Sequence, residues 1–259
     1  GILWHLSRVS LLVLLPKSSA ALHRTLSIMA STEKVFARVG KCENVRITAA
    51  GGIKLPDVLE STPFKDWAKS MDEDLIINNV HIQSVDYFGK RVGFIKFISE
   101  VTDAEGHKLP GIVFMRGGAV AVLVVLECEK DEYCLLTQQA RVPIGKSRFL
   151  EIPAGMLDGS GHFSGVAAKE MEEETGIVIE PSDLVDLTDA AYGSKYPGMY
   201  PSCGGSDEFI RIFAHRKQVT REYMQELHGK LTGSAHENEF IALHIAPLAN
   251  VWELSPDSK

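Results

Sequence analysis

Four glutamates lie close together in the stretch GVAAKEMEEETGIVI, and three of them recur at helical spacing. At about 100° per residue, Glu170, Glu173 and Glu174 fall on one face of a predicted helix. Another side of this helix carries small and apolar residues, which suit packing against a sheet. These residues are Ala167, Ala168, Met171 and Thr175. The pattern predicts a helix that buries one side and gathers three carboxylates on another.

The ends of this helix bear on what the glutamates do. Ser164 is predicted to cap the N-terminus, and Gly176 to end the helix in a left-handed conformation. The glutamates then lie in the last turns, where the helix dipole disfavours each anion by about 0.3–1 kcal/mol. Repulsion between like charges adds to this cost. If the glutamates only form a solvated acidic face, this cost is uncompensated, whereas a bound divalent cation offsets it. Ligands that are all oxygen favour Mg²⁺, with Mn²⁺ as an alternative.

The segment from Gly155 to Ile177 resembles the Nudix box, G-x5-E-x7-R-E-U-x-E-E-x-G-U, in which U is a bulky aliphatic residue. The matching positions are Gly155, Glu170, Met171, Glu173, Glu174, Gly176 and Ile177. Two positions differ, because Gly161 stands at the first box glutamate and Lys169 at the box arginine. In the family these two residues pair and brace the loop against the helix, so one structural salt bridge is expected to be missing. The metal-binding half of the motif is intact.

Flanking residues resemble the ADP-sugar and ADP-ribose pyrophosphatase branch of that family. The segments that carry this likeness are LLTQQARVP, FLEIPAGM, YPSCGGSDEF and HENEFIALHI. The resemblance implies that Arg141 contacts the diphosphate with its planar guanidinium. It implies that Glu151 acts near the sugar or a metal, and that Glu208 is the acid of a substrate-binding motif. The late loop, with Glu237 and Glu239, is expected to face the helix carboxylates.

The reaction implied by this resemblance is attack of water on a phosphorus of an ADP-sugar, which gives AMP and a sugar 1- or 5-phosphate. The expected metal ligands are Ala154 (through its carbonyl), Glu170, Glu174 and Glu239. Bound metals neutralise the diphosphate and lower the pKa of water. Glu173 is expected to support the cluster. Glu237 is the candidate general base, with Glu239 as its nearest competitor.

Other functions remain open at this point. UDP-sugars are alternative substrates to ADP-glucose and ADP-ribose, and a Nudix-fold sensor that binds a nucleotide sugar without cleaving it is possible in view of Gly161 and Lys169. Three crowded anions favour the enzyme over the sensor. A formal net charge of -7 argues against a nucleic-acid partner, and hence against RNA decapping.

The pattern of strands and helices predicts an α/β protein. With the family resemblance, we expect a Nudix α/β/α sandwich with a small N-terminal antiparallel β-sheet unit. Short strands are predicted at Val80–Tyr87, Val92–Ser99 and Ile112–Arg116, with a turn at 103–106 and a short helix at Phe64–Ser70. Later strands are predicted at Ala119–Leu126, Tyr133–Gln139, Phe209–Ala214 and Phe240–Ile245, and a helix at Arg221–Leu231. The Nudix domain is expected over 117–259. Residues 33–116 form the β-rich unit, which we expect to make a homodimer because small sheets expose edges.

The first 32 residues read as a transit peptide, because they lack acidic residues and carry Arg8, Lys17, Arg24 and several serines. A chloroplast location is expected, which favours ADP-glucose as a substrate. A mitochondrial location is an alternative, as is the cytosol if translation starts at Met29. The apolar run Leu11–Leu15 is far shorter than the roughly 20 residues that span a membrane, so no membrane partner is expected. Four cysteines without metal-ligand spacing are expected to be reduced.

Overall fold

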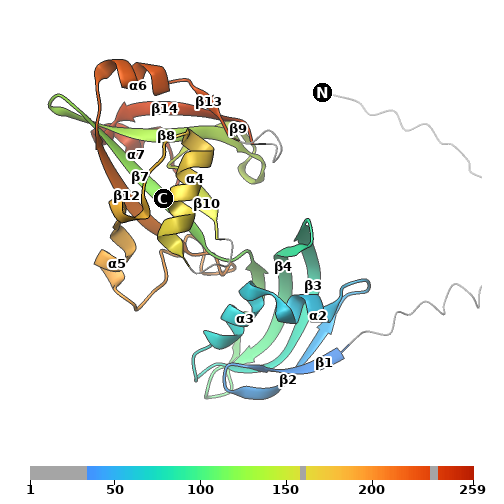
Figure 1. The fold of residues 1–259 in the computed structure, drawn as a ribbon. Helices are drawn as coiled ribbons and strands as arrows, with labels where there is room; N and C mark the ends of the chain where they lie inside the picture. The colour runs from blue at the N-terminus through green and yellow to red at the C-terminus, as the bar shows by residue number, and fades with distance from the viewer. Residues whose placement is uncertain (1–33, 158–161, 234–238) are drawn as a thin grey trace, which may run out of the picture.

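The computed structural model describes residues 34–157, 162–233 and 239–259. The predicted transit peptide, Gly161 and Glu237 lie outside these residues. The described chain forms two sheets, each with helices packed against it (Figure 1). Among the described helices, none is long and apolar enough to cross a membrane.

The N-terminal sheet has six strands, in the order β1-β2-β3-β4-β5, with β6 paired to β4. Its strands are β1 Lys34–Val39, β2 Cys42–Ala49, β3 Ile76–Phe88, β4 Arg91–Thr102, β5 Lys108–Leu109 and β6 Ile112–Met115. Helices α2 (Leu55–Glu60) and α3 (Thr62–Lys69) follow β2 and cover one face of the sheet (Figure 1). Pro63 lies in the first turn of α3, where its missing N–H costs no hydrogen bond.

The expected small antiparallel sheet is only part of this unit. The three predicted strands correspond to β3, β4 and β6, which pair antiparallel as expected. However, β1 and β2 add to the sheet, and β2 runs parallel to β3. Parallel neighbours need a crossover connection, and α2 and α3 provide it.

The two faces of the N-terminal sheet differ in cover. Alternate residues of β4, such as Ile95 and Phe97, are buried under the helices, where Trp67 packs edge-on to Phe97 with ring centroids 4.8 Å apart. On the uncovered face, large apolar side chains remain 40% exposed or more, including Ile98, Ile112 and Phe114. This face is an uncovered apolar surface within the described residues.

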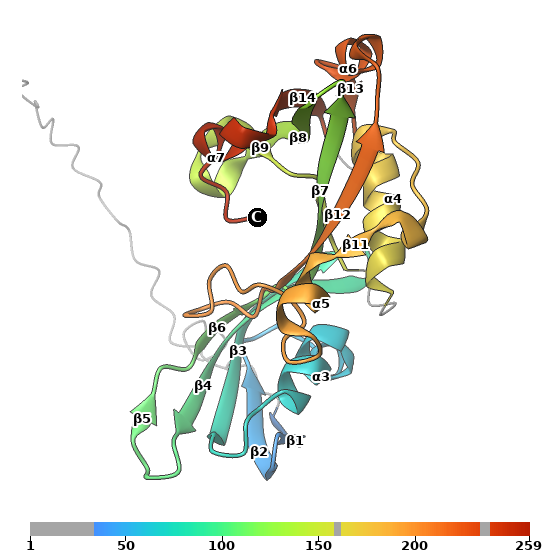
Figure 2. The same ribbon diagram turned by 90° about the vertical axis from the view of Figure 1, so that its left-hand side faces the viewer.

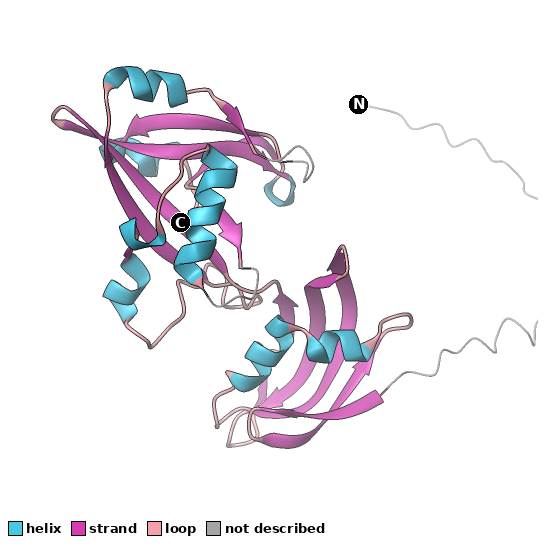
Figure 3. Cartoon of the chain, in the orientation of Figure 1, coloured by secondary structure: helices cyan, strands magenta, loops and turns pink. Residues whose placement is uncertain are grey.

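The second sheet has eight strands, in the order β11-β12-β7-β8-β14-β13, with β10 paired to β7 and β9 to β8. Its strands are magenta in the upper part of Figure 3, with helices in cyan against them. Its strands are β7 Ala119–Cys128, β8 Asp131–Arg141, β9 Lys146–Glu151, β10 Ala154–Met156, β11 Val185–Asp186, β12 Ile210–Gln218, β13 Leu231–Thr232 and β14 Ile241–Pro247. β7 is parallel to β12 and antiparallel to β8. Because β7 is buried on both faces, its sequence is continuously apolar, as predicted.

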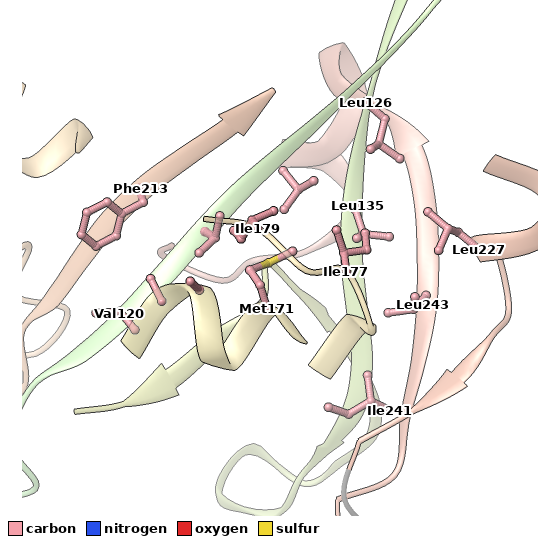
Figure 4. Packing of buried hydrophobic residues seen from close by; sticks show 14 of the residues in the cluster. Val120, Leu126, Leu135, Met171, Ile177, Ile179, Phe213, Leu227, Ile241 and Leu243 are labelled. Atoms are coloured by element: carbon pink, nitrogen blue, oxygen red, sulfur yellow. The ribbon is translucent and has the colours of Figure 1, made fainter. Parts of the chain in front are cut away.

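Helix α4 (Phe163–Thr175) packs on one face of this sheet. Met171 and the following Ile177 lie against β7, β8 and β14 (Figure 4). On the other face, η4 (Leu248–Asn250) and α7 (Val251–Leu254) cover Ala121 and Leu136. Figure 2 shows α4 on one side of β7 and β12, with α7 and the C-terminal end on the other. The predicted α/β class is confirmed, and helical elements pack on both faces of the sheet.

The remaining elements are short. They are η1 Val142–Ile144, η2 Pro181–Asp183, α5 Leu187–Tyr192 and α6 Arg221–Leu227. The predicted helix at Arg221–Leu231 is too long, because α6 ends at Leu227 and the chain then turns through Gly229 with φ +80°. Leu231 instead begins β13, which pairs with β14.

Candidate active site

The local geometry of α4 agrees with the sequence at one end and differs at the other. Gly176 follows the last helical residue with φ 72°, as predicted. The side chains expected to pack against the sheet, Ala167, Ala168, Met171 and Thr175, are all buried. The prediction that Ser164 caps the helix is wrong, because His162 is the N-cap residue, without a side-chain cap hydrogen bond. Ser164 therefore lies in the first turn.

Glu174 is the most deeply buried carboxylate of α4, with 4% of its surface exposed. Its Oε2 accepts a hydrogen bond from the Ala154 backbone N–H at 3.0 Å, and Oε1 accepts one from Gln139 Nε2 at 3.4 Å. Burial raises the pKa of Glu174 to about 8, and the negative charges of Glu170, Glu151 and Glu239 add to this effect. Burial and the neighbouring negative charges together therefore outweigh the hydrogen bonds that favour the ionised form of Glu174.

Glu170 lies one helical turn before Glu174 and packs directly on the backbone of Gly155. Its carboxyl carbon is 1.8 Å from the position that a Cβ on Gly155 would take. No side chain larger than hydrogen fits there without displacing Glu170. The glycine that opens the motif therefore makes room for the Glu170 carboxylate beside the backbone of β10.

Glu151 lies beside this pair of carboxylates and accepts hydrogen bonds from two basic side chains. It is 3% exposed, and its Oε1 accepts a hydrogen bond from Arg141 Nε at 2.6 Å. Its Oε2 accepts one from Lys259 Nζ at 2.8 Å. The structure therefore brings Arg141, Glu151, Ala154, Glu170, Glu174 and Glu239 into one region, as expected.

Glu173 does not join this cluster. Its side chain is 46% exposed and forms an ion pair with Lys169 at 3.1 Å, one turn away on the same helix. The predicted common face therefore holds for Glu170 and Glu174 but not for Glu173. Lys169, which stands at the box arginine, pairs along the helix with Glu173.

Glu208 forms an ion pair with Arg116 at 3.3 Å, near the junction between the two sheets. The neighbouring Asp207 accepts hydrogen bonds from the backbone N–H groups of Arg116 and Gly117. Asp207 is partly buried, and this burial raises its pKa. This acidic pair holds the chain where it passes from β6 into β7, apart from the α4 carboxylates.

The segment that contains Glu237 begins and ends beside α4. Thr232 Oγ1 donates a hydrogen bond to the Glu174 carbonyl at the end of the helix. A Cβ on Gly233 would lie 2.8 Å from the Glu239 carbonyl oxygen, so the two residues that flank 234–238 are in contact. Glu239 is half-buried, and its charge acts on Glu174.

Two residues of the site were not identified from the sequence. Gln139 lies in the segment QQAR, so its position two residues before Arg141 on β8 was a usable signal. Lys259 is 108 residues from Glu151 and carries no local signal. Only the folded chain brings it to the carboxylate.

A wide cleft of about 840 Å³ lies between the N-terminal unit and the second sheet. Trp67 and Arg116 line it from one side, and Met156, Phe163 and Tyr200 from the other. Met156 directly follows Gly155, so β10 leads from the carboxylate cluster to the wall of the cleft. Its volume lies within the range of small-molecule sites, roughly 300–1,000 Å³.

A separate acidic group lies at the turn between β4 and β5, where Asp103, Glu105 and His107 come together. Asp103 accepts hydrogen bonds from both the backbone N–H and the ring Nδ1 of His107. These bonds close the turn and explain the arrangement without a bound ion.

Comparison with known proteins gives consistent matches. A family model described as NUDIX domain matches residues 115–257. The protein named Nudix hydrolase 14, chloroplastic, of Arabidopsis thaliana is 42% identical over 230 residues, covering 84% of this chain and 74% of that protein. The ADP-ribose pyrophosphatase of Bacillus subtilis is 27% identical over 158 residues, covering 61% and 73% of the two chains. That of Haemophilus influenzae is 25% identical over 209 residues, covering 74% and 86%.

Proposed function

Because this chain belongs to the Nudix domain family and is a hydrolase of that family, we propose that it cleaves the diphosphate bond of ADP-sugars. The products would be AMP and a sugar 1- or 5-phosphate. The observation that carries this proposal is the buried carboxylate cluster around Glu174, with Arg141 beside it. The names of the two bacterial relatives support an ADP-linked substrate.

The donor set of the cluster suits a divalent metal. Glu170 and Glu174 would hold the ion together with the Ala154 carbonyl, all through oxygen, as Mg²⁺ or Mn²⁺ requires. Glu239 would complete the set. The raised pKa of Glu174 supports this fit, because a bound cation would offset both the burial and the neighbouring negative charges that disfavour the ionised carboxylate. When bound, the metal would neutralise the diphosphate and lower the pKa of water.

The chain's own residues would orient the substrate and move the proton. Arg141 would bind the diphosphate through its guanidinium, whose fork matches two phosphate oxygens. Glu237 would take the proton from the attacking water, with Glu239 as the alternative. The contact between Gly233 and Glu239 supports this assignment, because it keeps both ends of the segment 234–238 beside α4. Glu208 would bind substrate from the junction side, whereas Glu173, paired with Lys169 away from the cluster, is left without a role in it.

The cleft beside Met156 supports a substrate larger than a free diphosphate. Its volume of about 840 Å³ suits a nucleoside or sugar joined to a diphosphate at the carboxylate cluster. ADP-glucose and ADP-ribose both meet this requirement. The protein would act as a homodimer through the uncovered face of its N-terminal sheet, and in the chloroplast, as the name of the Arabidopsis relative suggests.

The test is product analysis after incubation of the purified protein with ADP-glucose, ADP-ribose and UDP-glucose, each with Mg²⁺ and with a chelator. We expect AMP and a sugar phosphate from the ADP-sugars, only with Mg²⁺. Glu174→Gln should remove most of this activity. Glu172→Gln is the matched control, because Glu172 is exposed on the same helix. Binding of ADP-sugars without any cleavage would refute the proposed hydrolysis and favour a sensor. Faster cleavage of UDP-glucose than of the ADP-sugars would show that UDP-sugars are the preferred substrates.

A further inference from the structure

Lys259 joins the candidate site through the same carboxylate that holds Arg141. Glu151 accepts a hydrogen bond from Arg141 on one oxygen and from Lys259 on the other, at 2.6 and 2.8 Å. We infer that Lys259 is a positioning residue of the diphosphate site, which acts through Glu151 to hold Arg141 in the orientation that binds phosphate. The inference rests on the proposed function in taking Arg141 as a ligand of the diphosphate.

The ammonium group of Lys259 is fixed from two sides. Its side chain is 12% exposed, and Asp257 Oδ2 accepts a second hydrogen bond from Lys259 Nζ at 2.9 Å. The other oxygen of Asp257 accepts the Lys259 backbone N–H at 2.8 Å. A buried ammonium is unfavourable unless it is paired, and here two carboxylates provide the pairing. The position of Lys259 is therefore set by contacts at both its backbone and its charge.

The orientation of Arg141 depends on the carboxylate it meets. Its side chain is 39% exposed, so solvent leaves much of it free to move. A carboxylate bonded at one oxygen can still rotate, whereas Glu151 is bonded at both and so presents Oε1 in a fixed direction to Arg141 Nε. The two terminal nitrogens of the Arg141 guanidinium have no hydrogen-bond partner among the described residues. They form the fork that can bind two phosphate oxygens.

The experiment measures binding of α,β-methylene-ADP, a diphosphate with an uncleavable bridge, by calorimetry in the presence of Mg²⁺. Lys259→Met removes the charge but keeps most of the side-chain volume. We expect it to weaken binding about tenfold to hundredfold, the factor for one charge-assisted hydrogen bond. Lys259→Arg should restore most of the affinity, because it again supplies a donor to Glu151. Lys130→Met is the matched control, at an exposed lysine in the turn between β7 and β8, and should bind normally.

The decisive comparison is made in an Arg141→Ala background. If Lys259 acts only through Arg141, Lys259→Met should cause no further loss of affinity there, and the two changes should be strongly non-additive. An additive loss would overturn the inference, since it would mean that Lys259 binds the ligand directly or acts through stability alone. Unchanged or tighter binding by Lys259→Met in the wild-type background would also overturn it.

Two further measurements keep the result interpretable. Thermal unfolding of each variant separates loss of fold from loss of binding, and Asp257→Asn offers a milder change if Lys259→Met does not fold. Asp257→Asn should weaken binding in the same non-additive way, and full affinity would count against the inference. Binding does not depend on turnover, so a wild-type protein that binds the analogue but cleaves no ADP-sugar would refute the proposed function and leave the inference standing.

Discussion

Replacement of Glu174 by glutamine tests the electrostatics of the site without substrate. In the folded, metal-free protein the Glu174 carboxyl has a pKa of about 8, against an ordinary value of 4.5. Between these values the folded state keeps a proton that the unfolded state releases. The contribution of Glu174 to the stability of the metal-free protein should therefore be fully present below about pH 4.5. It should be lost as the pH rises towards about 8. Glu174→Gln cannot titrate and should lack this loss.

The size of the effect follows from the pKa shift. One proton corresponds to about 1.4 kcal/mol per pH unit, so the full window is worth up to about 5 kcal/mol. Glutamine turns one oxygen into an NH₂ group, so a donor from Ala154 or Gln139 loses its acceptor, at a cost of about 1–2 kcal/mol. At pH 8 we therefore expect Glu174→Gln to exceed the metal-free wild type by about 3 kcal/mol. For a chain of this size, this corresponds to a rise in Tm of roughly 6–12 °C.

The assay is thermal unfolding between pH 5 and pH 9 in the presence of a chelator, repeated with Mg²⁺. Glu172→Gln is the control, because it removes a carboxyl from the exposed side of the same helix. Added Mg²⁺ should stabilise the wild type and Glu172→Gln, but much less Glu174→Gln, because ligand binding stabilises only the state that binds. This reasoning would be refuted if Glu174→Gln were less stable than wild type at pH 8 without metal. It would also be refuted if Mg²⁺ stabilised Glu174→Gln as much as it stabilises the wild type.

Three other predictions concern the base, the motif glycine and assembly. Glu237→Gln should lower kcat by roughly 10²–10⁴-fold with KM nearly unchanged. Glu239→Gln, measured alongside, decides between the two residues, and normal turnover in both would place the base elsewhere. Gly155→Ala should weaken Mg²⁺ binding in calorimetry, because its Cβ overlaps the Glu170 carboxyl; unchanged affinity would contradict this. Ile112→Glu, on the uncovered face, should convert a wild-type dimer to a monomer in sedimentation. A monomeric wild type at micromolar concentration would contradict the dimer.

The sequence predicted the elements whose signals are local. Gly176 ends α4 because a left-handed residue needs glycine there, and the apolar run of β7 marks a strand buried on both faces. The same reasoning failed where a local pattern had two solutions. Ser164 is a good capping residue, yet the helix begins at Phe163, before it. The run from Arg221 to Leu231 favours a helix only as far as Leu227, because Gly229 then turns the chain with φ +80° and Leu231 pairs with β14.

The spacing of the glutamates, the motif glycine and the arginine at the end of β8 were all determined by the sequence, because helical and strand periodicity fix which residues can share a region. Tertiary structure decided which of them meet. Glu173 and Glu174 are adjacent and differ by about 100° around the helix, so only the position of the sheet decides that Glu174 is buried while Glu173 pairs with Lys169. The partnership of Lys259 with Glu151 spans 108 residues. It depends on the path of the whole chain after β9, which no local pattern encodes.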